Sequence, residues 1–154
     1  MHKFICISGC TASGKSSFAI ELADYFESPV IINADALQVY DCWKILTDRP
    51  TEKKTMHDLY GHVSYTVNYS VGDWIKDVKN IFDLYSKNSK TFIFVGGTGL
   101  YFNALLNGLS QIPQIPEEIR DFANSCDLSF FLEGLNINDP GILEKIDTNN
   151  RRRV

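Results

Sequence analysis

A glycine-rich run near the N-terminus has the residue types and the spacing to bind a phosphate group. Gly9-Cys10-Thr11-Ala12-Ser13-Gly14-Lys15-Ser16 fits the pattern G-x-x-x-x-G-K-[ST]. In such a loop the glycines let backbone amides turn towards an anion, and the helix that follows adds the positive end of its dipole. Lys15 would neutralise phosphate oxygens, and the Ser16 hydroxyl would hold a magnesium ion. The alternative is a chance match in a glycine turn.

The residues on either side of this run favour the phosphate loop over a chance match. The apolar run Phe4-Ile5-Cys6-Ile7 predicts a strand over residues 4–8, and residues 17–26 have the pattern of a helix. The order strand, glycine loop, helix is the context in which the pattern is specific. We therefore expect the protein to bind a diphosphate or triphosphate, although the loop alone does not define which one.

Asp35 is the second candidate for chemistry. It follows Val30-Ile31-Ile32, a short apolar run that is typical of a buried parallel strand. Parallel sheets bind ligands at the carboxyl ends of their strands, so Asp35 should face whatever Lys15 holds. Its carboxylate could hold a metal ion through water or take a proton from a nucleophile. It could equally cap the turn that follows, and its position alone does not separate these roles.

Alternating strands and helices are predicted up to about Gly108. Ser70 is expected to cap a helix, with Asp73 in a capping-box role. The most distinct strand is Thr91-Phe92-Ile93-Phe94-Val95, which leads into Gly96-Gly97-Thr98-Gly99. The remaining predictions for this part are a loop over residues 42–56, a short strand over 62–67, a helix from Ser70 to about Lys87, and a helix over 100–107.

The pattern changes after Gly108. Residues 111–116 contain two prolines and fit neither a regular helix nor a central strand. Short helices are then predicted over residues 117–125, 128–134 and 140–146. We therefore expect an α/β fold with a P-loop NTPase-like parallel sheet flanked by helices in residues 1–110. The start of a helical accessory region would follow in residues 111–154.

Composition and charge narrow the class of protein. Hydrophobic residues make up 44% of the 154 residues and charged residues 22%, which is ordinary for a globular domain. The formal net charge of -4 argues against a generally basic surface for nucleic acids, so any contact with RNA would be local. Four cysteines without a C-x-x-C pair and three scattered histidines predict reduced cytosolic thiols and no zinc site.

The sequence also gives expectations about location and partners. No apolar run is long enough to span a bilayer, and the N-terminal apolar stretch is too short for a signal peptide. We therefore expect a cytoplasmic protein with no membrane partner, and no protein partner is evident.

The kind of phosphate chemistry stays open at this point. Proteins that hydrolyse ATP usually have an apolar strand that ends in a carboxylate and orders the magnesium ion. Here the strand over residues 91–95 ends in glycines, and Asp35 is the only well-placed carboxylate.

Several segments of the chain occur together in an order that is typical of one family. They are Gly9–Ser16, Asn33–Tyr40, His57–Val63 with Tyr69–Val71, Val95–Phe102, and Gly108–Ser110 leading to Pro113 and Asp139–Pro140. In this combination the chain resembles the tRNA dimethylallyltransferases, also called tRNA isopentenyltransferases. The phosphate loop alone would be unspecific, but V-G-G-T-G-L-Y-F makes the match specific, and it covers essentially the whole chain.

The resemblance implies a reaction. A dimethylallyl group would pass from dimethylallyl diphosphate to the exocyclic N6 amine of the adenosine 3′ of a tRNA anticodon, and pyrophosphate would leave. Asp35 would accept the proton of the amine, Thr11 would lie beside the reacting atoms, and Lys15 would stabilise the leaving group with Mg²⁺ on Ser16. The implied diphosphate contacts are Gly9, Cys10, Thr11, Ala12, Ser13, Gly14, Lys15, Ser16 and Thr98. The implied tRNA contacts are Asp35, Ala36, Leu37, Gln38 and Arg153.

The chain departs from the family pattern at a few places. Cys10 replaces a proline, Ala36 replaces a serine and so removes a hydroxyl near the acceptor base, and residues 45–50 match G-T-A-K-P poorly. Family members continue with further basic helices, so we interpret residues 111–154 as an incomplete tRNA-contacting region. Two other hypotheses remain: a small-molecule kinase with the same loop, and a non-catalytic remnant that only binds pyrophosphate.

Overall fold

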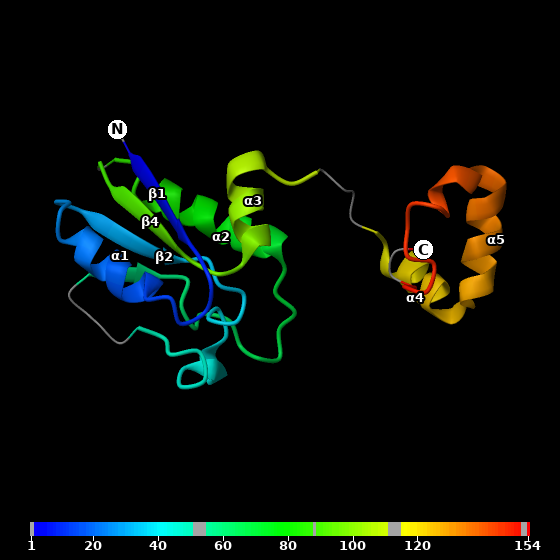
Figure 1. Cartoon of the computed structure of the whole chain (residues 1–154), viewed down its shortest axis with the longest axis horizontal. Helices are drawn as coiled ribbons and strands as arrows, with labels where there is room; N and C mark the ends of the chain where they lie inside the picture. The colour runs from blue at the N-terminus through cyan, green and yellow to red at the C-terminus, as the bar shows by residue number, and fades with distance from the viewer. Residues whose placement is uncertain (1, 51–54, 88, 111–114, 152–153) are drawn as a thin grey trace. The chain divides into compact units, whose positions relative to one another are not determined.

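The computed structural model describes residues 2–50, 55–87, 89–110, 115–151 and 154. They form two compact units, Met1–Ser110 and Gln111–Val154 (Figure 1). The first unit is a parallel sheet covered by helices, and the second is a small group of helices. Within the described residues, no helix is long and apolar enough to cross a bilayer.

The sheet of the first unit has four parallel strands in the order β1-β4-β2-β3. The register places Ser8 opposite Gly96, and Asn33 opposite Val95. The segments that follow these three strands therefore leave the sheet at the same edge, as the all-parallel prediction requires. The strands are β1 (Lys3–Ser8), β2 (Pro29–Asn33), β3 (Met56–Asp58) and β4 (Thr91–Gly96).

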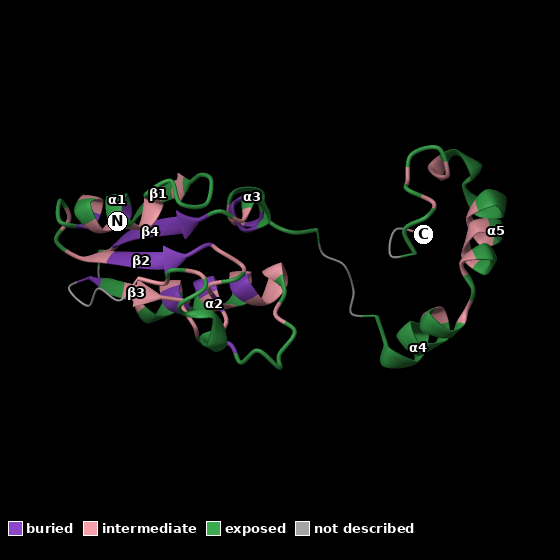
Figure 2. Ribbon diagram, turned by 60° about the horizontal axis from the view of Figure 1, so that its bottom comes forward, coloured by how far each residue is buried: buried purple, intermediate pink, exposed green. Residues whose placement is uncertain are grey.

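Helices cover both faces of the sheet, which explains the continuous apolar runs of β2 and β4. Helix α1 (Lys15–Ala23) packs on one face through a buried cluster that includes Ile31 and Ile93. Helices α2 (Val71–Leu84) and α3 (Gly99–Asn107) belong to the larger cluster on the other face, which includes the fully buried Trp74. Figure 2 shows that β2 and β4 are buried along most of their length. Because side chains alternate between the two faces of a sheet, a strand buried on both faces favours a continuous apolar run.

The start of α2 confirms the predicted capping box. The Ser70 hydroxyl accepts a hydrogen bond from the Asp73 amide at 3.2 Å, and the Asp73 carboxylate accepts one from the Ser70 amide at 3.1 Å. The first turn of α2 also contacts the sheet through a hydrogen bond, which the Trp74 indole donates to the Asn33 carbonyl at 2.8 Å. The helix ends at Leu84, before the predicted boundary at Lys87.

The prediction of a strand over residues 62–67 is wrong, and the edge strand is β3 instead. Val63 makes only an isolated bridge to Tyr40, and a turn follows in which the Val67 amide donates to the Ser64 carbonyl at 3.0 Å. The loop predicted over residues 42–56 also contains part of a short 3-10 helix, η1 (Asp41–Trp43). β3 has the sequence Met-His-Asp, which shows no apolar alternation because an edge strand is buried on fewer sides.

The second unit contains α4 (Glu117–Ser125), α5 (Leu128–Asn138) and the 3-10 turn η2 (Pro140–Ile142). α4 has the predicted bounds, whereas α5 runs past Gly134 to Asn138. The predicted helix over residues 140–146 is wrong, because only a 3-10 turn forms where proline and glycine open the segment. Arg151 donates to the carbonyls of Ala123, Asn124 and Cys126 and so caps the C-terminal end of α4.

Candidate active site

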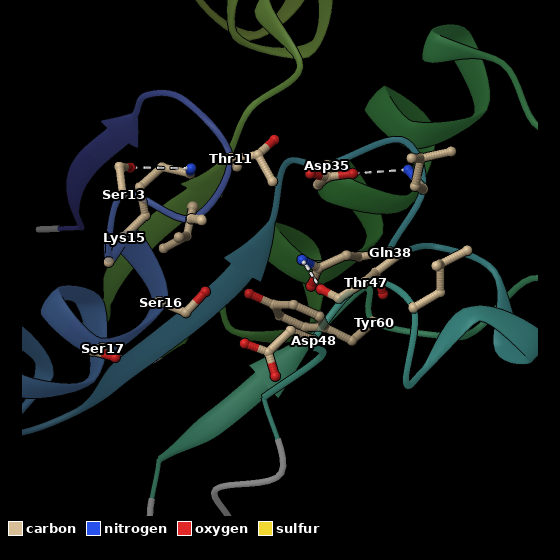
Figure 3. Close-up of a pocket in the computed structure, with 16 residues that line it drawn as sticks. Thr11, Ser13, Lys15, Ser16, Ser17, Asp35, Gln38, Thr47, Asp48 and Tyr60 are labelled. Atoms are coloured by element: carbon tan, nitrogen blue, oxygen red, sulfur yellow. Dashed lines mark hydrogen bonds between the residues drawn. The ribbon is translucent and has the colours of Figure 1, made fainter.

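A cavity of about 330 Å³ lies at the edge of the sheet where the parallel strands end (Figure 3). The phosphate loop (Gly9–Ser16) and the start of α1 form one wall. The segment after β2, residues 46–48 and the segment after β3 form the others. The lining residues are Thr11, Ala12, Ser13, Gly14, Lys15, Ser16, Ser17, Asp35, Leu37, Gln38, Leu46, Thr47, Asp48, Tyr60, Val95 and Gly96.

The phosphate loop presents the N-terminus of α1 to this cavity. Gly14 is the N-cap of α1 and has φ 82°, a left-handed conformation that glycine adopts without a steric penalty. It makes no side-chain cap, and the first turn of α1 carries no acidic residue. The Lys15 ammonium donates to the Cys10 carbonyl and lies 3.4 Å from the Ser13 hydroxyl. The amides at the start of α1 and this ammonium therefore offer positive charge to an anion in the cavity.

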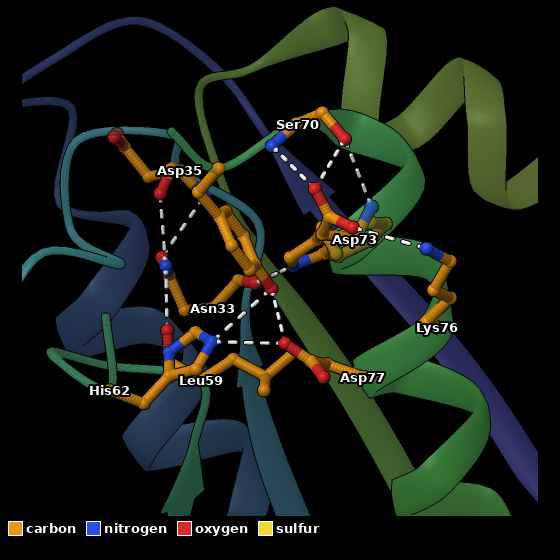
Figure 4. A network of polar contacts seen from close by, with 10 residues as sticks. Asn33, Asp35, Leu59, His62, Ser70, Asp73, Lys76 and Asp77 are labelled. Carbon is orange, nitrogen blue, oxygen red and sulfur yellow. Dashed lines mark hydrogen bonds and ion pairs between the residues drawn. The ribbon is translucent and has the colours of Figure 1, made fainter. Parts of the chain in front are cut away.

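Asp35 both caps a turn and lines the cavity, so the two roles left open by the sequence coexist. Its Oδ1 accepts a hydrogen bond from the Leu37 amide at 2.9 Å. No described residue donates to Oδ2, which leaves this oxygen available to a ligand. Asn33 is fully buried and fixes the Asp35 backbone from both sides, accepting from its amide at 3.0 Å and donating to its carbonyl at 2.9 Å (Figure 4).

The second glycine loop holds the backbone around Asp35. A Cβ atom added to Gly96 would lie 2.0 Å from the Ala34 carbonyl oxygen and 2.7 Å from the Asp35 amide nitrogen. The Thr98 hydroxyl accepts a hydrogen bond from the Ala36 amide at 2.9 Å, and the Thr98 amide donates to the Ala34 carbonyl at 3.3 Å. The glycine-rich signature thus allows β4 to approach the segment that carries the carboxylate.

The structure brings together most, but not all, of the predicted site residues. Residues 11–16, Asp35, Leu37 and Gln38 line the cavity. Gly9, Cys10, Ala36 and Thr98 are not among the lining residues, and the Thr98 hydroxyl is engaged by Ala36. Arg153 lies outside the described residues. The diphosphate and tRNA contacts of these residues stay predictions.

Sequence reasoning missed the wall formed by Leu46, Thr47 and Asp48. Gln38 holds this wall by donating to the Thr47 carbonyl at 3.1 Å. Arg49, the residue after this wall, is also fixed, because its guanidinium donates to the carbonyls of Tyr40 and Asp41. The only signal in the sequence was the poor match of this stretch to the family pattern.

Tyr60 is a further lining residue that the sequence did not single out. Its ring packs against the apolar cluster under α1 and meets the His57 ring edge-on, with the ring centroids 5.7 Å apart. Burial raises the pKa of Tyr60, and the negative charge of Asp35 raises it further. The phenol is therefore neutral at physiological pH and offers the cavity a hydroxyl group rather than a phenolate.

The charges in the cavity limit what it can bind unaided. Among the described lining residues, Lys15 is the only cation, whereas Asp35 and Asp48 are both carboxylates. The described residues contain no group of three His, Cys, Asp or Glu side chains that could hold a metal ion by themselves. Mg²⁺ fits as a partner shared with a phosphate ligand, since Ser16 and the carboxylates supply the oxygen donors that this ion prefers.

A separate polar network lies beside the start of α2 (Figure 4). The Tyr69 hydroxyl donates to the Asp77 carboxylate at 2.6 Å, and His62 Nε2 lies 3.2 Å from both groups. None of these residues lines the cavity. The network ties the loop before α2 to the helix, and we assign it a structural role.

Comparison with known proteins gives consistent matches over most of the chain. The family model described as IPP transferase matches residues 38–154. A tRNA dimethylallyltransferase from Ruegeria sp. (strain TM1040) is 44% identical over 153 residues, which is 97% of this chain and 50% of that protein. The enzyme of the same name from Bartonella tribocorum is 54% identical over 117 residues, 74% of this chain and 39% of that protein.

Solved structures give the same picture. A eukaryotic dimethylallyltransferase acting on tRNA matches with a TM-score of 0.80 at 28% identity, covering 99% of this chain and 40% of that chain. The tRNA isopentenylpyrophosphate transferase from Bacillus halodurans matches with a TM-score of 0.64 at 29% identity, covering 99% and 53%. The chain thus spans about half the length of the curated relatives it matches.

Proposed function

The chain belongs to the IPP transferase family, and on that premise we propose that the protein transfers a dimethylallyl group to tRNA. The donor is dimethylallyl diphosphate, the acceptor is the exocyclic N6 amine of the adenosine 3′ of the anticodon, and pyrophosphate is released. The observation that carries the proposal is that the phosphate loop and the Asp35 carboxylate line one cavity. A leaving group and a base that act on one substrate pair need this arrangement.

The phosphate loop acts on the leaving group in this proposal. As the allylic C–O bond breaks, its electron pair moves to the diphosphate, which gains negative charge. The amides at the start of α1 and the Lys15 ammonium stabilise that charge. When bound, Mg²⁺ supplies further charge neutralisation, and the Ser16 hydroxyl would hold it. Thr11 lies in the same wall and would contact the reacting end of the donor.

Asp35 acts on the acceptor. The amine nitrogen forms the new C–N bond, and its proton passes to the free Oδ2 of Asp35. Asn33 and Thr98 hold the backbone around Asp35 through hydrogen bonds, so the carboxylate is in place before the substrates bind. The adenosine must leave its stack to reach this oxygen, which suits the single-stranded loop of an anticodon stem.

Leu37 and Gln38 would contact the adenosine. Both line the cavity next to Asp35, and Gln38 Oε1 is buried without a hydrogen-bond partner in the described residues. A buried carbonyl oxygen without a donor is costly, and the Gln38 side chain would have to turn for this oxygen to accept from the adenine amine. We extend the proposal to residues 111–154 as a region that contacts tRNA away from the acceptor adenosine.

The experiment combines donor binding with a transfer assay. Calorimetry should show that dimethylallyl diphosphate binds more tightly than ATP, because no arginine occurs among the described residues that line the cavity, and a kinase lid would need one. Tighter binding of ATP would favour the kinase hypothesis. Labelled donor and an anticodon stem-loop should give a labelled RNA with the wild-type protein, and Asp35→Asn should lower the rate at least about 100-fold. Equal rates would refute the role of Asp35, and donor binding without any transfer would favour the remnant.

A further inference from the structure

Asp48 is a carboxylate that the proposed reaction does not use, although it lies in the same cavity. Asp35 already supplies the base, and a second negative charge should repel a diphosphate. In Figure 3 Asp48 and the Tyr60 hydroxyl lie on the side of Ser16, whereas Asp35 lies on the side of Thr11. Asp48 therefore faces the end of the cavity where the proposed metal-bound phosphate would sit.

The position of Asp48 is fixed by contacts on both sides of it. The residue before it, Thr47, is held by Gln38 and by its own hydroxyl, which donates to the Trp43 carbonyl at 2.7 Å. The residue after it, Arg49, donates from its amide to the Lys44 carbonyl at 3.1 Å. Asp48 itself has φ 47°, a left-handed conformation that aspartate and asparagine tolerate better than most residues.

Arg49 adds a second restraint that depends on a nearby glycine. A Cβ atom on Gly61 would lie 1.7 Å from Arg49 Nη1, so the guanidinium occupies the space left by the missing side chain. The guanidinium donates to the carbonyls of Tyr40 and Asp41, and Arg49 is not among the residues that line the cavity. Arg49 therefore does not neutralise Asp48 within the site. The described lining residues thus carry two carboxylates and one cation.

We propose that Asp48 binds the magnesium ion of the magnesium–diphosphate complex from the side opposite the phosphate loop, directly or through one water molecule. This inference rests on the proposed function, because it requires a diphosphate on Lys15 and Ser16. A divalent cation between Asp48 and the diphosphate turns a repulsive pair of charges into two attractive ones. The Tyr60 hydroxyl lines the same cavity and would donate a hydrogen bond to the water of the bound ion.

The inference predicts that the effect of Asp48 on binding changes sign with magnesium. The experiment is calorimetric titration of inorganic pyrophosphate into the wild-type chain and Asp48→Asn, in EDTA and in excess Mg²⁺. Without Mg²⁺ the variant should bind about threefold more tightly, because a repulsive charge is gone. With Mg²⁺ it should bind about tenfold more weakly, as is typical when a metal site loses a supporting carboxylate.

Asp41→Asn is the matched control, since it removes the same charge from the adjoining stretch of chain without touching the cavity. It should change either affinity by less than about twofold. Asparagine also tolerates the backbone of residue 48, so the main variant is not expected to misfold, and circular dichroism checks this.

Two results would overturn the inference alone: equal affinities of wild type and Asp48→Asn in Mg²⁺, or the same loss of affinity with and without Mg²⁺. A wild-type chain that binds no pyrophosphate under either condition would overturn the proposed function and this inference with it.

Discussion

Substitution of Gly96 by alanine should damage both the fold and the site. The added Cβ atom would lie 2.0 Å from the Ala34 carbonyl oxygen and 2.2 Å from its carbon. Non-bonded carbon and oxygen atoms normally stay about 3.3 Å apart or more, so the two chain segments must separate by roughly 1 Å. These atoms belong to backbone next to the central strands, so no flexible side chain can absorb the movement.

The geometry gives the expected size of the effect. Overpacking of a tight contact costs about 1–3 kcal/mol, and we expect a loss near the upper end because backbone must move. The Ala34–Asp35 segment would be displaced, which should shift the carboxylate by a similar distance. A misplacement of about 1 Å in a catalytic group costs on the order of 100-fold in rate. Pyrophosphate binding should change much less, because the phosphate loop is a separate segment.

Gly99→Ala is the matched control, since Gly99 is the first residue of α3 and nothing lies within 4 Å of its added Cβ. That variant should be as stable as the wild type or up to about 1 kcal/mol more stable. Urea unfolding measures the free energy of unfolding of each variant, and the stem-loop assay measures transfer. If Gly96→Ala equals Gly99→Ala in both stability and rate, the close approach of β4 to Ala34 is not a feature of the protein.

Three further predictions concern the elements that position the site. Ser70→Ala should lower the free energy of unfolding by about 1 kcal/mol, because it removes the cap of α2, and urea unfolding measures this. Hydrogen bonding to Ser70 lowers the pKa of Asp73, so the stabilisation from this carboxylate is complete above the ordinary carboxyl pKa of 3.8 and is lost as the pH falls below it. Unfolding measured between about pH 2 and pH 5, which includes the region below the ordinary carboxyl pKa where the stabilisation is lost, should therefore depend less on pH in Ser70→Ala than in the wild type. An unchanged dependence would contradict the capping box. Trp74→Phe should lower the free energy of unfolding by about 2 kcal/mol, because the buried Asn33 carbonyl loses the indole donor and a void is left. Urea unfolding measures this loss, and an unchanged stability would mean that the hydrogen bond to the sheet is not made.

Local patterns in the sequence predicted the central part of the fold well. Val30–Ile32 and Phe92–Val95, the central parts of β2 and β4, are apolar at every position, as is typical of a strand covered on both faces. The capping box at Ser70 was predictable because its two partners are three residues apart. The phosphate loop was predictable for the same reason, since its pattern is contiguous and stands between a strand and a helix.

Features that depend on distant contacts were not predictable in this way. β3 has no apolar alternation, and it pairs with β2 from 26 residues away, as in the Ile31–His57 pair. Asp48 and Tyr60 reach the cavity through irregular backbone that Arg49, Gln38 and Gly61 hold in place. No pattern of residue types reveals such contacts, so the wall opposite the phosphate loop emerged only from the structure.

The most direct test of the account is a crystal structure with dimethylallyl thiodiphosphate, a donor whose allylic bond is slow to break. The diphosphate should contact Lys15 and the amides of the phosphate loop. The allylic carbon should face Asp35, with room for a nitrogen about 3 Å from Oδ2. A diphosphate bound elsewhere, or an allylic group directed away from Asp35, would contradict the proposed function.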